Sequence, residues 1–395
     1  MLTVSEARGR ILTALTPTPA ETIPLAAAHN RILAATVIAR LTQPPADVSA
    51  MDGFALRAQD APAGATLKII GTAPAGHPFP GIIGPSQAIH IFTGSIIPEG
   101  ADSVLIQEES STTGDTVTVL ETCQPAKNIR RAGQDFCAGE TLLEPGQRLT
   151  PRGIGLAAAA NHPWLFVHRK PRIAILATGD EISLPGEAIP HGGIISSNAH
   201  ALAAFVTACG ADPVILPIAV DTMDAITAGA RAAAGADLLV TTGGASVGAH
   251  DLVQSSLNSQ GLDLKFWKIA MRPGKPLMFG QLGPLPVIGL PGNPVSAMVC
   301  ALLFLRPAIE RLSGLPGEAP ATDSATLTTA LKPNDQREDY LRATLTHTET
   351  GWHVTPFPIQ DSGMLKTFAN ATALINRPPH DPAHPAGATV KIIRL

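Results

Sequence analysis

Three apolar segments of this chain run directly into glycine-rich turns that end in polar residues. They are PRIAILATGD at 171–180, TTGGASVGAHD at 241–251 and LPGNPVS at 290–296. In an α/β sheet the carboxyl ends of parallel strands meet at one edge, and ligands bind in the crevice there. Backbone amides at helix starts suit phosphate groups, and carboxylates suit a hard divalent cation. The pattern therefore predicts an α/β sheet with a site for a phosphate-bearing ligand and a metal ion.

Size and composition limit the class of protein. A chain of 395 residues is longer than one hydrophobic core normally serves, which predicts two to four domains. The net charge of -4 argues against nucleic acid as the main partner, because that role needs a basic face. The four cysteines have no metal or disulfide spacing. With no signal peptide and no apolar run of membrane-spanning length, we expect a cytoplasmic protein that does not contact membranes.

The texture of the sequence changes along the chain. Thr3 and Glu6 have capping-box spacing, which predicts an N-terminal helix. Short β-prone runs between residues 43 and 129 predict a β-rich unit, inserted into a separate N-terminal unit that resumes near residue 140. Alternating strands and helices over 171–312 predict a mostly parallel sheet with helices on both faces. The Thr- and Pro-rich segment 323–395 predicts a small β-barrel or sandwich.

Carboxylates follow three of the predicted strands. Glu181 follows the first strand, Asp221 follows the strand predicted at 213–220, and Asp251 follows the glycine-rich turn. Because these strands are expected to end at one sheet edge, the three acids are candidate ligands for a magnesium ion. Acidic residues also favour helix starts and turns, so helix capping is the alternative.

The glycine-rich turn admits two interpretations. The amides of Gly243, Gly244 and Gly248 can approach an anion closely, because glycine has no side chain. The same letters contain G-x-S-x-G around Ser246, the pattern of a hydrolase nucleophile elbow. An elbow needs an acid and a histidine downstream, and the surroundings of His353 do not fit that role. Anion binding is therefore favoured over hydrolysis, and an ordinary tight turn stays the alternative.

Three cations lie on one predicted strand and the turn after it. Lys268, Arg272 and Lys275 could hold an oxyanion or phosphate, since Pro273 and Gly274 fix the turn between them. A solvated charged edge would have the same composition. Farther along, Asn293 or Ser296 can cap a helix whose N-terminus is also suited to an anion.

Seven motifs occur together and in a fixed order. They are SAMDGFAL (49–56), IFTGSIIPEGADSVLIQEE (91–109), IRRAGQDF (129–136), LATGDEI (176–182), TTGGASVGAHD (241–251), FWKIAMRPGKP (266–276) and LPGNPVSAMV (290–299). In this order they resemble the molybdopterin molybdotransferase family, which includes the E domain of gephyrin. Any one motif alone would be weak, but seven in order across most of the chain are specific.

The resemblance implies a multidomain α/β plus β fold and an elongated homodimer. We set the expected boundaries at 1–45 with 136–170 for an elongated N-terminal domain and 46–135 for the inserted β-rich domain. Residues 171–318 form the expected α/β molybdopterin-binding domain, and 319–395 the C-terminal β domain. The implied active site is a cleft between the last two domains, faced by the N-terminal half of the other subunit.

The implied reaction transfers molybdate into adenylylated molybdopterin and releases AMP, with Mg²⁺ as the metal. Transient contact with the adenylyltransferase that makes this substrate is also implied. The family's acids fall on Asp52, Asp135, Glu181, Asp221 and Asp251. Its substrate contacts fall on Thr93, Arg130, Lys268, Lys275, Pro291 and Pro294. The other expected binding residues are the glycine turn with Ser246, Asn293 and Ser296. Arg272 stands where the family often has lysine, and Arg342 and Ser362 are the candidate molybdate contacts.

Two other functions compete with molybdate insertion. An adenylyltransferase would share the α/β domain, and consumption of ATP with molybdopterin would identify it. A gephyrin-like scaffold would bind peptides without enzymatic activity. The N-terminal half and the C-terminal domain favour insertion over the first, and the length of the chain favours it over the second.

Overall fold

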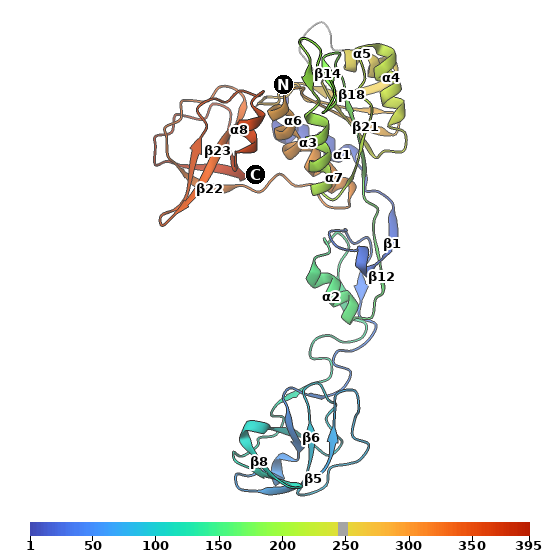
Figure 1. Ribbon diagram of the computed structural model, residues 1–395, viewed down its shortest axis with the longest axis vertical. Coiled ribbons are helices and arrows are strands. Elements are labelled where there is room, and N and C mark those ends of the chain that lie inside the picture. Colours follow the sequence, from blue (N-terminus) through green and yellow to red (C-terminus); the bar gives the residue numbers. More distant parts are fainter. Residues whose placement is uncertain (244–251) are drawn as a thin grey trace.

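The structure, a computed structural model, describes residues 1–243 and 252–395. The molecule is elongated, with a β-rich unit at one end and a narrow neck in the middle (Figure 1). At the other end an α/β unit lies beside the C-terminal β unit. This arrangement confirms the predicted multidomain α/β plus β fold. Within the described residues, no helix is long and apolar enough to cross a membrane.

A six-stranded sheet forms the centre of the α/β unit. Its order is β16 (Asp212–Ile215), β13 (Arg172–Ala177), β17 (Leu238–Thr242), β21 (Leu285–Leu290), β20 (Met278–Leu282) and β18 (Leu262–Trp267). The first four strands are parallel, and the last two are antiparallel to their neighbours. All residues of β17 are buried, as expected for a strand covered on both faces. The prediction of a parallel sheet is thus correct for these four strands.

Helices cover both faces of this sheet. The helices α3 (Asn198–Ala208), α6 (Pro294–Cys300) and α7 (Arg306–Leu312) pack on one face. The helices α4 (Met223–Ala232) and α5 (Leu252–Ser259) pack on the other. Between α6 and α7 the five residues Ala301–Leu305 form a π-helical turn. This turn lies just before Pro307, where the helical chain adapts to a residue that has no N–H to donate.

The N-terminal helix α1 (Val4–Ala14) has the predicted capping box, in which Thr3 and Glu6 bind each other's backbone. Its packing differs from the prediction. The buried residues Val4, Ala7 and Ile11 belong to the core of the α/β unit, and α1 lies against α7. The α/β unit thus covers the apolar face of this helix, and the grouping of residues 1–45 with the elongated domain stays a prediction.

The neck consists of chain segments that run out and return beside each other. The antiparallel pairs are β1 (Ala20–Pro24) with β12 (Trp164–His168), β2 (Val37–Ile38) with β11 (Thr141–Leu143), and β3 (Val48–Ser49) with β10 (Ile129–Arg130). Helix α2 (Pro151–Ala159) packs on the first pair. Beyond the neck, the inserted unit is a sheet in the order β7 (Ser103–Ile106), β4 (Gly53–Leu56), β6 (Gln87–Ile91), β5 (Thr66–Ala73), β9 (Thr116–Val119) and β8 (Ser110–Thr113).

The C-terminal unit is a closed barrel, as predicted. Its strands are β23 (Glu338–Thr348), β24 (Gly351–Pro356), β22 (Asp323–Leu327), β26 (Thr389–Arg394) and β25 (Ala373–Arg377), and β25 pairs back with β23. A short helix, α8 (Leu365–Ala369), lies between β24 and β25. One strand of the α/β unit, β19 (Met271–Arg272), pairs with β23. This pairing links the two units, and a cleft lies between them.

Candidate active site

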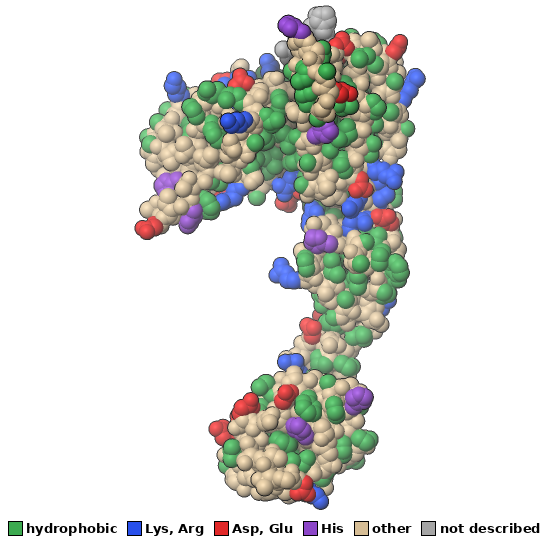
Figure 2. All heavy atoms as spheres, viewed as in Figure 1, with side chains coloured by type: hydrophobic (Ala, Val, Ile, Leu, Met, Phe, Trp, Pro, Cys, Tyr) green, Lys and Arg blue, Asp and Glu red, His purple; other side chains and the backbone are tan. Residues whose placement is uncertain are grey.

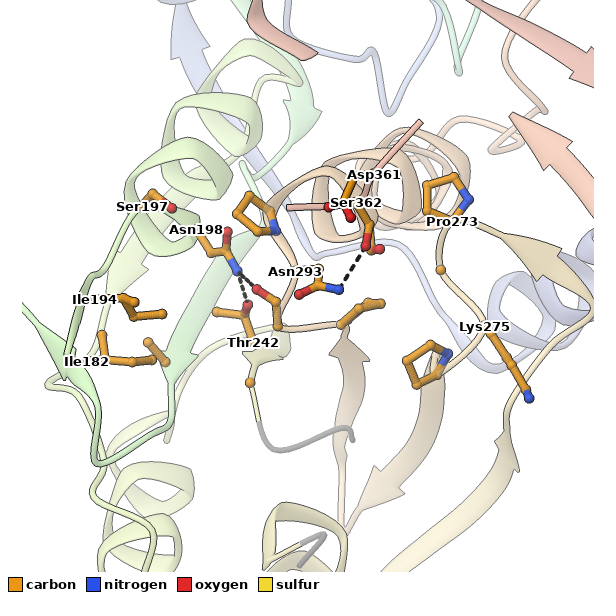
Figure 3. A pocket seen from close by; sticks show the side chains of 18 of the residues that line it. Ile182, Ile194, Ser197, Asn198, Thr242, Pro273, Lys275, Asn293, Asp361 and Ser362 are labelled. Atoms are coloured by element: carbon orange, nitrogen blue, oxygen red, sulfur yellow. Dashed lines mark hydrogen bonds between the residues drawn. The ribbon is translucent and has the colours of Figure 1, made fainter. Parts of the chain in front are cut away.

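A cavity of about 740 Å³ lies between the α/β unit and the C-terminal barrel (Figure 3). On one side it is lined by the carboxyl ends of β13, β17 and β21, and by the start of α3. The turn after β19 and the loop 360–362 form the opposite side. A short parallel pair, β14 (Ile182–Ser183) and β15 (Ile194–Ile195), borders it. The cavity therefore lies at the sheet edge where ligands of open α/β folds bind.

Three turns converge on the floor of this cavity. The amide of Thr178 donates to the carbonyl of Thr242 across 3.1 Å. Gly243 has a φ of +100°, and a Cβ there would lie 2.3 Å from the Thr178 carbonyl oxygen. A Cβ on Gly292 would lie 3.5 Å from the Cα of Gly243. Backbones this close leave no room for a side chain at Gly243, so the predicted meeting of the three strand ends depends on this glycine.

Acidic residues gather beside the same turns. Glu181 lines the cavity, and the backbone N–H of Asp221 donates to the Asp180 carboxylate across 2.8 Å. Burial raises the pKa of Asp221, and the charges of Asp180 and Glu181 raise it further. Uncompensated carboxylates of this kind fit a divalent cation. No three acidic, His or Cys side chains in the described part of the chain could hold a metal ion by themselves.

Four predicted residues lie outside the described residues. They are Gly244, Ser246, Gly248 and the third predicted metal ligand, Asp251.

The three predicted cations have different surroundings. Lys275 lines the cavity. Arg272 also lines it, but its guanidinium donates to Asp339, Asp335 and Asn334 of the C-terminal unit. Lys268 has a φ of +70°, and its Nζ lies 3.8 Å from the centroid of the Trp267 ring. Lys268 is not among the described residues that line the cavity. Only Lys275 is thus both at the cavity and uncommitted to a carboxylate in the described ion pairs.

The start of α6 is joined to the barrel. Asn293 Nδ2 donates to Ser362 Oγ across 2.8 Å, and the amide of Val295 donates to the Ser362 carbonyl across 3.0 Å (Figure 3). Pro291, Pro294 and Ser296 line the cavity next to this contact. The structure therefore brings Asn293 and Ser362 together, although 69 residues separate them in the chain.

Arg342 lies behind the cavity wall rather than on it. Its side chain is fully buried, and it donates to the Asp361 carbonyl across 3.2 Å. Burial lowers the pKa of this guanidinium. Gln360 accepts from the Arg342 amide and donates to its carbonyl, so the loop 360–362 rests on β23. Arg342 supports the wall that carries Ser362, and its contact with molybdate stays a prediction.

Several cavity residues were not identified from the sequence. They are Asn198, Thr242, Arg337, Gln360 and Asp361. Asn198 is the first residue of α3. The N-cap of α3 is Ser197, which makes no side-chain capping bond, while the Asn198 amide contacts the floor of the cavity. Arg337 and Gln360 lie in the C-terminal domain. Local sequence patterns do not show where that domain sits relative to the α/β unit.

A second group of predicted residues lies in the inserted unit. The Asp52 carboxylate accepts from the Thr93 amide (2.7 Å) and hydroxyl (2.8 Å), and these bonds lower the pKa of Asp52. Arg130 is exposed on β10, where it pairs with Val48 next to the pairing of Ile129 with Ser49. Asp135 is exposed nearer the neck. This unit lies at the opposite end of the molecule from the cavity (Figure 1).

Comparison with known proteins accounts for most of the chain. Residues 2–161 match the MoeA N-terminal region (domain I and II), 174–311 match a probable molybdopterin binding domain, and 324–395 match the MoeA C-terminal region (domain IV). The crystal structure of the molybdopterin biosynthesis moeA protein from Pyrococcus horikoshii OT3 has a TM-score of 0.86 and 25% identity over 100% of both chains. Fold and site thus define a MoeA-type protein with a cleft beside the domain that matches the probable molybdopterin binding domain.

Two full-length relatives identify the family. The molybdopterin molybdenumtransferase of Haemophilus influenzae is 35% identical over 380 residues, which are 95% of this chain and 94% of that protein. Molybdopterin molybdenumtransferase 2 of Mycobacterium tuberculosis is 37% identical over 90% of each chain. The chain belongs to the molybdopterin molybdenumtransferase family.

Proposed function

We propose that this protein inserts molybdate into adenylylated molybdopterin and releases AMP. The observation that carries the proposal is the cavity between the α/β unit and the barrel, where three glycine-containing turns, a carboxylate group and Lys275 meet. A phosphoanhydride and a dianionic oxyanion repel each other, so such a site must provide both amide donors and positive charge. The membership of the chain in the molybdenumtransferase family supports the same reaction.

The residues can be assigned roles in this reaction. The amide of Gly243 and the start of α6 bind phosphate oxygens, and Lys275 with Ser362 holds molybdate. Glu181 and Asp221, with Asp251, would hold Mg²⁺, which when bound neutralises phosphate charge and polarises the scissile linkage. Asp52 remains ionised because Thr93 donates to it twice, so it can orient a water molecule or accept a proton.

Asp221→Asn tests the metal site. Without metal, the variant should be as stable as the parent protein or slightly more stable, because the repulsion from Asp180 and Glu181 is relieved. Added MgCl₂ should raise the melting temperature of the parent protein and leave that of Asp221→Asn unchanged, as measured by differential scanning fluorimetry. Asp224→Asn, on the first turn of α4, is the matched control. An equal response of all three proteins to MgCl₂ would contradict the assignment.

We propose further that the protein works as a homodimer. Within one chain, Asp52 and Thr93 lie at the far end from the cavity, so a second copy is needed to bring them to it. The neck offers a surface for this contact. Trp164 and Phe166 are exposed on one face of β12, beside Pro24 and Thr22 of β1, and Figure 2 shows hydrophobic side chains gathered on the neck. Burial of such a patch is a typical source of dimer stability.

The double change Trp164→Glu/Phe166→Glu should produce a monomer, because it places two charges in the buried centre of the interface. Sedimentation velocity measures the mass directly. Trp352→Glu, an exposed tryptophan on the barrel, is the control and should leave the dimer intact. A monomeric parent protein would contradict the proposal.

We place the protein in the cytoplasm, in transient contact with the adenylyltransferase that supplies its substrate. The free state of all four cysteines supports a reducing compartment.

The decisive experiment for the function is AMP release from adenylylated molybdopterin with MgCl₂, with and without molybdate. Molybdate-dependent release supports insertion. ATP consumption with free molybdopterin would instead identify an adenylyltransferase, and peptide binding without either activity a scaffold.

A further inference from the structure

Asn198 connects three segments on the floor of the cavity. It is the first residue of α3, and its Nδ2 donates to Thr242 Oγ1 across 2.9 Å and to the Gly292 carbonyl across 2.7 Å (Figure 3). An asparagine amide nitrogen carries two hydrogens, so both are used. The side chain is thereby fixed between the end of β17 and the turn before α6.

This bond determines what the Thr242 hydroxyl can do. A threonine hydroxyl has one hydrogen to donate and lone pairs that accept. Because Asn198 donates to Oγ1, the hydrogen of Thr242 must point elsewhere. Within the described part of the chain, no hydrogen bond uses it. Thr242 is only 2% exposed yet lines the cavity, so a donor is held at the cavity wall with water largely excluded.

A second buried hydroxyl lies at the same place. Thr178 Oγ1 is buried and has no hydrogen-bond partner among the described residues. Thr178 lies in the turn that packs against Gly243, and Gly243 is the residue that follows Thr242. Buried polar atoms without partners cost free energy, so they are uncommon unless a ligand or another group completes them. Of these groups, Thr242 and Gly243 line the cavity and can reach a ligand there, while the Thr178 hydroxyl lies buried beside them.

We infer that Thr242 is a substrate-binding residue whose hydroxyl donates to a phosphate oxygen, and that Asn198 is the positioning residue that orients it. The inference rests on the proposed function, which places a phosphoanhydride in this cavity. Phosphate oxygens are the ligand class that fits, because they accept hydrogen bonds and lie well at a glycine turn. Asn198 also sets the spacing between Thr242 and Gly292, and so between the two turns that would hold the ligand.

Isosteric variants separate the orientation of the hydroxyl from packing. Thr242→Val keeps the shape and removes the donor, whereas Thr242→Ser keeps the donor. Asn198→Asp keeps the shape but replaces both donors with acceptors, so it would accept the Thr242 hydrogen and repel the Gly292 carbonyl. His200→Ala, on the exposed side of the same helix, is the matched control.

The measurement is the KM for adenylylated molybdopterin in AMP release, together with kcat. Thr242→Val and Asn198→Asp should each raise KM roughly tenfold or more, as expected for loss of a hydrogen bond to a charged group. Thr242→Ser should restore KM to within about twofold, since the donor returns. Melting temperatures of Thr242→Val and Thr242→Ser should stay close to that of the parent protein, which would exclude a merely structural role for the Thr242 hydroxyl, whereas Asn198→Asp should lower it because the bond to the Gly292 carbonyl is lost.

The double variant Asn198→Asp/Thr242→Val tests whether Asn198 acts through Thr242. If it does, the double variant should be no worse than the more affected single variant. If the increases in KM of the two single variants multiply in the double variant, the new carboxylate repels the ligand directly. An unchanged KM in Thr242→Val would refute the donor role. Either result overturns the inference. If the parent protein releases no AMP, the proposed function fails separately. Titration of adenylylated molybdopterin into the same variants then still decides whether Thr242 binds it.

Discussion

Gly243→Ala should lower molybdate-dependent AMP release by a factor of at least about one hundred. The new Cβ would lie 2.3 Å from the Thr178 carbonyl oxygen, on a backbone with a φ of +100°. Left-handed strain and overpacking each cost about 1–3 kcal/mol. The carbonyl is part of the backbone and cannot rotate away, so the turns at the floor of the cavity must separate. AMP release with saturating molybdate measures the loss.

Gly235→Ala is the matched control for this prediction. Gly235 also has a positive φ, +84°, but a Cβ there would meet no atom within 4 Å. It should cost about 1 kcal/mol of stability through the backbone alone and leave AMP release unchanged. Equal loss of activity in the two variants would show that backbone strain in the α/β unit, rather than the convergence of the turns, limits the reaction.

Arg272→Met should destabilise the contact between the α/β unit and the barrel. It removes the guanidinium from Asp339, whose side chain is only 4% exposed, and leaves a buried carboxylate without its partner. Loss of one partner of a fully buried pair costs about 3–5 kcal/mol. The Arg272 side chain is 44% exposed and therefore screened by solvent, so we expect about 2 kcal/mol, measured as a fall in the urea midpoint.

Lys265→Met is the control, because Lys265 pairs with Asp263 where both side chains are exposed. That pair should contribute less than about 1 kcal/mol.

The KM for molybdate distinguishes a structural role of Arg272 from a role in binding the oxyanion. Because the Arg272 guanidinium is committed to Asp339, its loss should change the KM for molybdate less than Lys275→Met does. A larger KM effect at Arg272 than at Lys275 would restore Arg272 to the oxyanion site.

Local patterns predicted what depends on neighbouring residues. The strand-turn pattern gave the convergence of Thr178, Gly243 and the turn at Gly292, because parallel strands must end at one edge. The capping box of α1 could be predicted in the same way, because its two residues are three positions apart. The unit against which α1 packs could not be predicted, since its apolar face fits either the neck or the α/β unit and only tertiary packing decides. Arg272 shows the same limit: its charge is visible in the sequence, but the acid that neutralises it comes from a domain more than 60 residues away.

The pairing of the neck implies an order of folding. Its partners are nested like parentheses: β3 with β10 lies innermost, then β2 with β11, then β1 with β12, and α1 with α7 is outermost. During synthesis each early segment must wait for a partner made later, while the inserted β unit is contiguous and complete first. The chain should therefore close from the inside outwards. Helix α1 would be among the last elements to find its place, because the segments that it packs against are made after it.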